Sequence, residues 1–173
     1  VGKTGLILVE AISMVSGRAL LSGLGQRPLR VWVWNGEDPS DELERRIAAI
    51  LLHYTVSGEE DVAGRLFVDS GRSTPLVIAS KLRDQVVVAV PLVEALIRQI
   101  RERQIDVFIV DPFVSSHAVP ENDNGAIDRV AKTWGQIAEA TGCAVELIHH
   151  VRKPASGSQA PFTIDDARGA VAL

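Results

Sequence analysis

The chain has 173 residues, which is enough for one α/β domain and too few for two domains of ordinary size. Hydrophobic residues make up 46% of it, and the formal net charge of −4 excludes a general attraction to nucleic-acid phosphates, so any such contact must be local. The single cysteine, Cys143, excludes an internal disulfide and is typical of a reducing, cytoplasmic setting, and no apolar run is long enough to span a bilayer.

The two ends of the sequence indicate a piece of a longer protein. The chain opens with VGKTGLILVE, so that its first residue is Val rather than Met. It closes with GAVAL, a strand-like apolar run without a cap. We therefore expect a domain that is cut within a phosphate-binding loop at its start and incomplete at its end.

Helices and apolar runs alternate along the first part of the chain. The first predicted helix follows the opening Gly-Lys-Thr and runs to about Gly23. RVWVWN at 30–35 predicts a buried strand. The second helix has a clear start, because Asp38 can cap it and Pro39 suits its first turn. This helix shows one apolar face, formed by Leu43, Ile47, Ile50 and Leu51. After it, RLFVDS at 65–70 is a weaker strand candidate.

The same alternation continues to the end. A third helix is predicted from about Pro91, and IDVFIVDP at 105–112 predicts a further strand. A fourth helix spans about 125–141, with Gly142 as its C-terminal stop. CAVELIHH at 143–150 predicts the last strand. The pattern predicts an α/β fold with a mostly parallel sheet and helices on both faces, whose ligand site lies at the carboxyl ends of the strands.

The opening residues match the second half of the phosphate-loop motif G-x-x-x-x-G-K-[ST]. Backbone N–H groups of Val1, Gly2 and Gly5 at the start of a helix would bind phosphate oxygens. Lys3 would reach the β- and γ-phosphates, and the Thr4 hydroxyl would bind magnesium. The tripeptide is short, and a solvated lysine before a helix is the alternative interpretation.

Two carboxylates follow predicted strands. Asp111 ends an apolar strand and can hold magnesium through water, although it can also cap the turn before Pro112. Glu37 ends another buried strand and can orient an attacking water molecule. The alternative makes Glu37 a helix-capping group like Asp38.

The last candidates lie toward the end of the chain. Adjacent residues on a strand face opposite ways, so His149 and His150 are a poor pair of metal ligands, and one of them can sense a γ-phosphate while the other packs in the core. His117 is predicted to lie on the surface. Arg168 is either a surface charge or an arginine finger that acts on a neighbouring subunit.

The ordered set GKT, NGEDP, IVDP, LIHH and ARGA resembles the RecA-like ATPases, most closely the RepA-type hexameric plasmid-replication helicases and the AAA-type ATPases grouped with them. The resemblance covers nearly the whole chain. It implies a RecA-like P-loop NTPase core over 1–173, with ATP and Mg²⁺ as cofactors and a ring, a hexamer in that family, as the assembly.

The resemblance also implies roles for single residues. Lys3 and Thr4 match the phosphate and magnesium ligands, Glu37 the catalytic glutamate and Asp111 the magnesium-side aspartate. His150 matches the γ-phosphate sensor and is preferred to His149, because it precedes Arg152 by two residues. Arg168 matches the intersubunit finger. Arg46 matches a nucleotide-site arginine whose role stays open.

Single-stranded DNA is the partner that the resemblance implies, through loops at 113–124 and 151–167. Only Arg152 and Lys153 supply cations there, and acidic residues outnumber them. Because each neutralised phosphate adds to affinity, we expect weak DNA binding unless a ring supplies many copies. The sequence therefore predicts an ATP-hydrolysing domain of a replicative helicase, with a regulatory ATPase switch or a non-hydrolysing nucleotide-binding module as alternatives.

Overall fold

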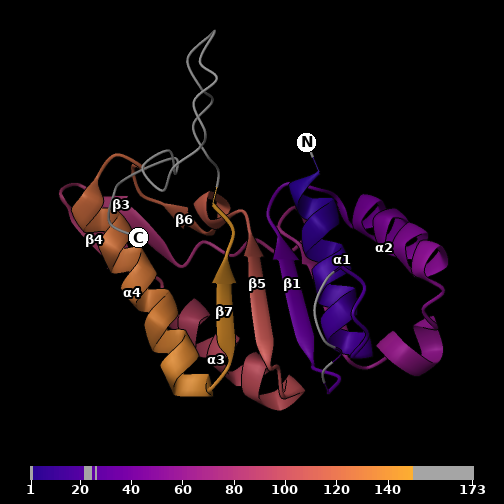
Figure 1. Cartoon of the computed structure of the whole chain (residues 1–173). Coiled ribbons are helices and arrows are strands. Elements are labelled where there is room, and N and C mark those ends of the chain that lie inside the picture. The colour runs from indigo at the N-terminus through magenta and orange to yellow at the C-terminus, as the bar shows by residue number, and fades with distance from the viewer. Residues whose placement is uncertain (1, 22–24, 26, 150–173) are drawn as a thin grey trace, which may run out of the picture.

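The computed structural model describes residues 2–21, 25 and 27–149 (Figure 1). The helices in this part of the chain are α1 (Lys3–Ser16), α2 (Ser40–Tyr54), α3 (Val90–Arg103) and α4 (Asn124–Thr141), with a π-helical turn at Gly58–Val62 and a 3-10 turn at Phe113–Ser116. The strands are β1 (Val31–Asn35), β2 (Leu66–Ser70), β3 (Ala79–Leu82), β4 (Gln85–Val88), β5 (Val107–Asp111), β6 (His117–Ala118) and β7 (Ala144–Leu147).

The main sheet has the strand order β2-β1-β5-β7, and all its pairs are parallel. The register pairs Asn35 of β1 with Ser70 on one side and with Asp111 on the other. The carboxyl ends of the strands therefore share one edge (Figure 1). The register brings the polar residues Asn35, Ser70 and Asp111 side by side at this edge. This arrangement confirms the predicted α/β fold with a parallel P-loop NTPase-like core.

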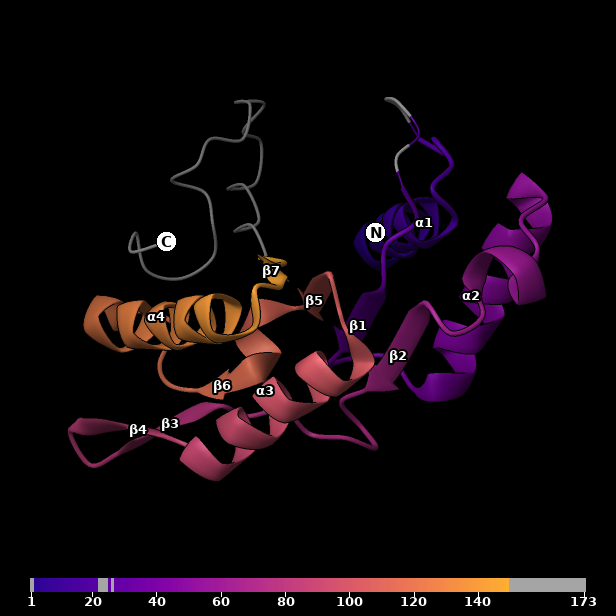
Figure 2. The same ribbon diagram turned by 90° about the horizontal axis from the view of Figure 1, so that it is seen from below.

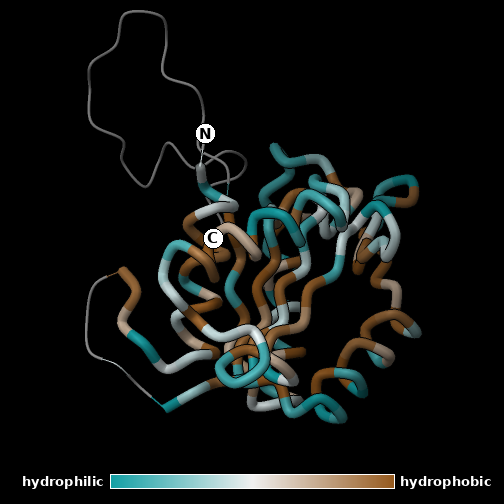
Figure 3. Tube along the Cα trace, turned by 90° about the vertical axis from the view of Figure 1, so that its right-hand side faces the viewer, coloured by the Kyte–Doolittle hydropathy of each residue, from teal (hydrophilic) through white to brown (hydrophobic). Residues whose placement is uncertain are grey.

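The two faces of the sheet form separate cores because side chains alternate along each strand. On β1, Val31 and Val33 pack with α1 and α2, whereas Trp32 and Trp34 pack with α3 and α4. Figure 2 shows α1 on one side of the strands and α3 on the other. Hydrophobic residues follow the strands, and hydrophilic ones dominate the turns (Figure 3).

Sequence reasoning missed a second, smaller sheet with the order β4-β3-β6. Strands β3 and β4 form an antiparallel hairpin, and β6 pairs in parallel with β3. Strand β6 lies inside the segment 113–124, which was predicted to be a loop that could contact DNA. Phe113, Ser116 and Val119 of this segment are buried, and its contact with DNA stays a prediction.

Two predicted helix boundaries also need correction. Helix α1 ends at Ser16 rather than near Gly23, because Gly17 adopts the left-handed conformation with φ 71°. Asp38 does not cap α2, whose N-cap is Pro39. Gly142, by contrast, ends α4 as predicted, with φ 71°. Within the described ranges, none of the helices has the length and apolarity needed to cross a membrane.

Candidate functional site

The first turn of α1 meets the end of β5 at the carboxyl edge of the main sheet. Thr4 Oγ1 donates a hydrogen bond of 2.8 Å to Asp111 Oδ2, although 107 positions separate the two residues. Asp111 is only 3% exposed, and Thr4 is half-buried. A hydroxyl and a carboxylate are hard oxygen ligands of the kind that Mg²⁺ prefers. The two residues predicted to hold magnesium therefore lie together, and their chemistry fits the ion.

A pocket of about 420 Å³ opens beside this pair. Gly2 has φ 100°, in the left-handed region that favours glycine. The free N–H groups of a helix N-terminus attract anions, and Lys3 extends from this turn, with its Nζ 3.4 Å from the His149 carbonyl. The pocket thus suits phosphate groups. Its lining consists of Gly2, Lys3, Thr4, Gly5, Asp38 and Arg46.

Arg46 also lines the pocket and is held by two carboxylates. Its guanidinium lies 2.8 Å from Asp38 Oδ2 and 2.8 Å from Glu42 Oε1. Burial disfavours the charged form, but the hydrogen bonds and charges of Glu42 and Asp38 outweigh it and raise the pKa of Arg46. The lining of the pocket therefore contains a second cation besides Lys3, and two carboxylates hold it in place.

Glu37 lies in a tight turn, residues 35–38, that directly follows β1. Asn35 Oδ1 accepts hydrogen bonds from the backbone nitrogens of Glu37 at 3.0 Å and of Asp38 at 2.7 Å. The Asn35 amide nitrogen donates to Asp111 Oδ2 at 3.0 Å. The Glu37 side chain is exposed, at the edge of the sheet where Asp111 also lies. The structure thus brings the backbone of Glu37 to the sheet edge that carries Asp111, but Glu37 is not among the residues that line the pocket.

The comparisons with known proteins agree with this geometry. A family model described as AAA domain matches residues 1–156. The chain belongs to the AAA domain family. The matched range includes the pocket, the turn at 35–38 and Asp111, so this AAA domain is a P-loop ATPase-type domain. Arg168 lies beyond the matched range, and the search of curated proteins finds no match.

Asn35 is the site residue that sequence reasoning missed. An asparagine at the end of a buried strand, directly before Gly36 and Glu37, is the signal that could have identified it, because Asn side chains bond to backbone N–H groups two residues on. The turns after β1 and β2 also touch. A Cβ atom on Gly71 would lie 2.8 Å from Gly36 Cα, so this close approach requires glycine.

His149 lies close to the pocket in this AAA domain, and its backbone contacts Lys3. Its carbonyl accepts from Lys3, and its ring lies 5.5 Å from that of Phe113. The predicted sites Val1, His150 and Arg168, and the candidate DNA loop at 151–167, lie outside the described residues. Which of the two histidines faces a γ-phosphate therefore stays a prediction.

The sequence predicted that His117 lies on the surface, but in the structure it is buried. It is 7% exposed, its Nδ1 accepts from Val119 N at 3.4 Å, and its Nε2 has no hydrogen-bond partner among the residues that the structure describes. Burial lowers the pKa of His117, Glu121 opposes that effect and His149 adds to it. The imidazole is therefore held in its neutral form.

The depressed pKa of His117 predicts a pH-dependent stability. The unfolded chain keeps the ordinary value of 6.5, so it binds more protons than the folded protein as pH falls below that value. The free energy of unfolding should decrease from about pH 7.5 to about pH 5.5 in urea titrations. His117→Asn should flatten this dependence, whereas exposed His53→Asn should leave it as in the wild type. Equal slopes in all three proteins would contradict the assignment.

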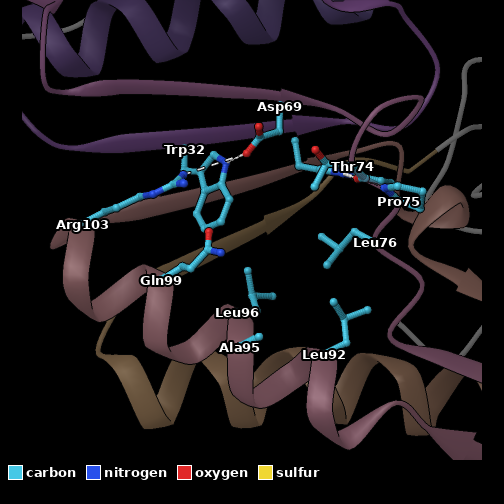
Figure 4. A pocket seen from close by; sticks show the side chains of 11 residues that line it. Trp32, Asp69, Thr74, Pro75, Leu76, Leu92, Ala95, Leu96, Gln99 and Arg103 are labelled. Carbon is cyan, nitrogen blue, oxygen red and sulfur yellow. Dashed lines mark hydrogen bonds and ion pairs between the residues drawn. The ribbon is translucent and has the colours of Figure 1, made fainter.

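A second cavity lies on the other face of the sheet, between β1 and α3 (Figure 4). It has a volume of about 300 Å³. Trp32 Nε1 donates to Asp69 Oδ2 at 2.8 Å, and the Arg103 guanidinium lies 4.4 Å from the Trp32 ring centre. This cavity contains none of the predicted site residues, so the candidate site is the pocket at the start of α1.

Proposed function

We propose that this AAA domain binds ATP with Mg²⁺ and hydrolyses it as part of a RepA-type ring protein. The observation that carries the proposal is the hydrogen bond of 2.8 Å between Thr4 and Asp111. It joins the two halves of a nucleotide site that are far apart in the sequence. The pocket beside it has the size and the positive charges that a nucleoside triphosphate needs.

The proposal gives each candidate residue a role. Lys3 and the N-terminus of α1 bind the β- and γ-phosphates. Thr4 and Asp111 would hold Mg²⁺, which when bound neutralises charge on the phosphate oxygens. Glu37 orients the water molecule that attacks the γ-phosphorus. His150 as γ-phosphate sensor and Arg168 as a finger from a neighbouring subunit complete the proposed site.

The segment 113–124 bears on what hydrolysis drives. It carries Glu121 and Asp123 but no lysine or arginine, and Lys81, which lies nearby, is paired with Asp123 at 2.7 Å. A segment whose only formal charges are acidic is a poor surface for DNA. The first candidate function is a translocase that acts on single-stranded DNA. The acidic segment is the observation that favours a second candidate, a regulatory ATPase switch.

The test is Mg²⁺-dependent ATP turnover of the full-length protein, with and without single-stranded DNA, beside Lys3→Ala. We expect turnover that the substitution abolishes, because Lys3 carries the charge nearest the phosphates. Stimulation by DNA would support the translocase, and turnover indifferent to DNA the switch. ATP binding without any turnover would overturn the hydrolase proposal and leave a binding module.

A second prediction concerns the pocket wall. Arg46→Ala should weaken ATP binding by about 10- to 100-fold, because hydrogen bonds to charged groups contribute about 1.5–3 kcal/mol. Arg45→Ala is the matched control, since Arg45 also pairs with Asp41 and Glu42 on α2 but lies outside the pocket. Equal affinities of the two variants, measured by equilibrium titration, would argue against a nucleotide contact by Arg46.

A further inference from the structure

The strand ends on either side hold the backbone of the turn at residues 35–38. From the end of β5, the Asp111 carbonyl accepts from the Gly36 N–H at 2.8 Å. The end of β2 and the turn that follows it supply three donors: Gly71 N to the Asn35 carbonyl at 2.7 Å, Arg72 Nε to the Glu37 carbonyl at 2.8 Å and Ser70 Oγ to the Asp38 carbonyl at 2.6 Å. Glu37 is therefore exposed but carried by a fixed backbone.

The remaining N–H groups of the turn are bound by one side chain. Asn35 is 1% exposed, and its Oδ1 accepts from both Glu37 N and Asp38 N. Its amide nitrogen donates to Asp111 Oδ2, the same oxygen that accepts from Thr4 Oγ1. A single buried carboxamide thus connects the carboxylate on the magnesium side to the backbone that carries Glu37.

We propose that Asn35 is a positioning residue that couples the metal-binding orientation of Asp111 to the placement of Glu37. The inference rests on the proposed hydrolysis of ATP. Because Asp111 Oδ2 faces both Thr4 and Asn35, a change in its position on metal binding is transmitted through the Asn35 amide to the N–H groups of the turn. Partners that orient metal-ligating carboxylates typically change metal affinity or activity by about 10- to 100-fold when removed.

The chemistry of this position favours an amide. The side chain must donate to a carboxylate on one side and accept from two N–H groups on the other. An ionised aspartate can only accept, and it would place a second negative charge about 3 Å from Asp111. A leucine of similar size can do neither. Asparagine supplies both functions without a charge.

Two substitutions of similar size separate these functions. Asn35→Leu removes all three hydrogen bonds, and we expect kcat to fall by about 10- to 100-fold while ATP affinity without Mg²⁺ stays unchanged. Asn35→Asp keeps the acceptor for the turn and changes only the contact with Asp111. We expect it to shift the Mg²⁺ concentration for half-maximal turnover by about threefold or more, with kcat at saturating Mg²⁺ retained. Should the leucine variant fail to fold, the aspartate variant alone decides.

Thr133→Val is the matched control for loss of a buried hydrogen bond. Thr133 is 4% exposed and bonds to the Arg129 carbonyl within α4, far along the chain from the site. It should keep the wild-type kcat and Mg²⁺ dependence. Three results would each overturn the proposal. The first is a wild-type kcat in Asn35→Leu, the second is an unchanged Mg²⁺ dependence in Asn35→Asp, and the third is a loss in the control equal to that in the Asn35 variants.

A double-mutant cycle separates positioning from a merely structural role. If Asn35 acts through Glu37, Asn35→Leu should cause no further loss of single-turnover rate in a Glu37→Gln background. Additive losses would overturn the positioning role. A wild-type protein without Lys3-dependent turnover contradicts the proposed function itself, whereas wild-type turnover with additive losses contradicts the inference about Asn35 alone.

Discussion

Glu37→Gln should lower Mg²⁺-dependent ATP turnover by about 10²- to 10⁴-fold, the range that a positioned general base contributes. The substitution keeps the size of the side chain and removes the carboxylate that would orient and deprotonate the attacking water. The backbone contacts of the turn to Asn35 and Arg72 do not involve the Glu37 carboxylate and should persist. The loss should therefore fall on kcat, and ATP affinity should stay close to that of the wild type.

Glu44→Gln is the matched control for this substitution. Glu44 lies on α2, seven positions after Glu37, and its side chain is exposed outside the pocket. Steady-state turnover and equilibrium ATP binding should both be unchanged in this variant. Equal turnover in the two glutamine variants would exclude Glu37 as the water-orienting residue, and a parallel loss of ATP binding in Glu37→Gln would give it a binding role instead.

The main sheet could be predicted from the sequence because its strands are short, largely apolar runs, three of which, β1, β2 and β5, end in a polar residue. Burial on both faces leaves this composition as a local signal. Asp111 and Glu37 could be placed at one edge for the same reason, since parallel strands align their carboxyl ends. The contact of Thr4 with Asp111 follows from that alignment and the helix that begins at the phosphate loop.

The second sheet could not be predicted in the same way. The hairpin of β3 and β4 has polar residues at its tip and turns at Arg83, a non-glycine residue with φ 56°. Strand β6, within the segment 113–124, forms by the pairing of His117 with Ala79, which are far apart in the sequence. Such long-range pairing leaves no local pattern, and a polar segment after a strand was therefore read as a loop.

Helix α1 shows a different kind of error. Its apolar periodicity continues past Gly17, so the pattern alone favours a longer helix. The left-handed conformation at Gly17 ends it, because this geometry closes the last turn. A glycine within an apolar run is compatible with both outcomes.

Phe108→Ala should destabilise the AAA domain by about 3–5 kcal/mol, which is a large part of the 5–15 kcal/mol that holds a typical domain together. Phe108 is fully buried on the α3 and α4 face of β5. Its ring centre lies 4.9 Å from that of Trp32 and 5.8 Å from that of Trp134. Removing the ring leaves a cavity between two large aromatic side chains that cannot both move to fill it.

Urea unfolding measures this cost, and Leu52→Ala provides the control. Leu52 is 84% exposed, so its substitution should change the free energy of unfolding by less than about 0.5 kcal/mol.

Phe108 is also three positions before Asp111 on the same strand, but it faces away from α1. Below its melting temperature, Phe108→Ala should therefore still be stabilised by ATP and Mg²⁺, because ligand binding to the folded state adds to stability whatever the core has lost. A variant that keeps wild-type stability would mean that the aromatic core closes around the missing ring. A folded variant that no longer responds to ATP would mean that this core, and not only the strand register, holds Asp111 in place.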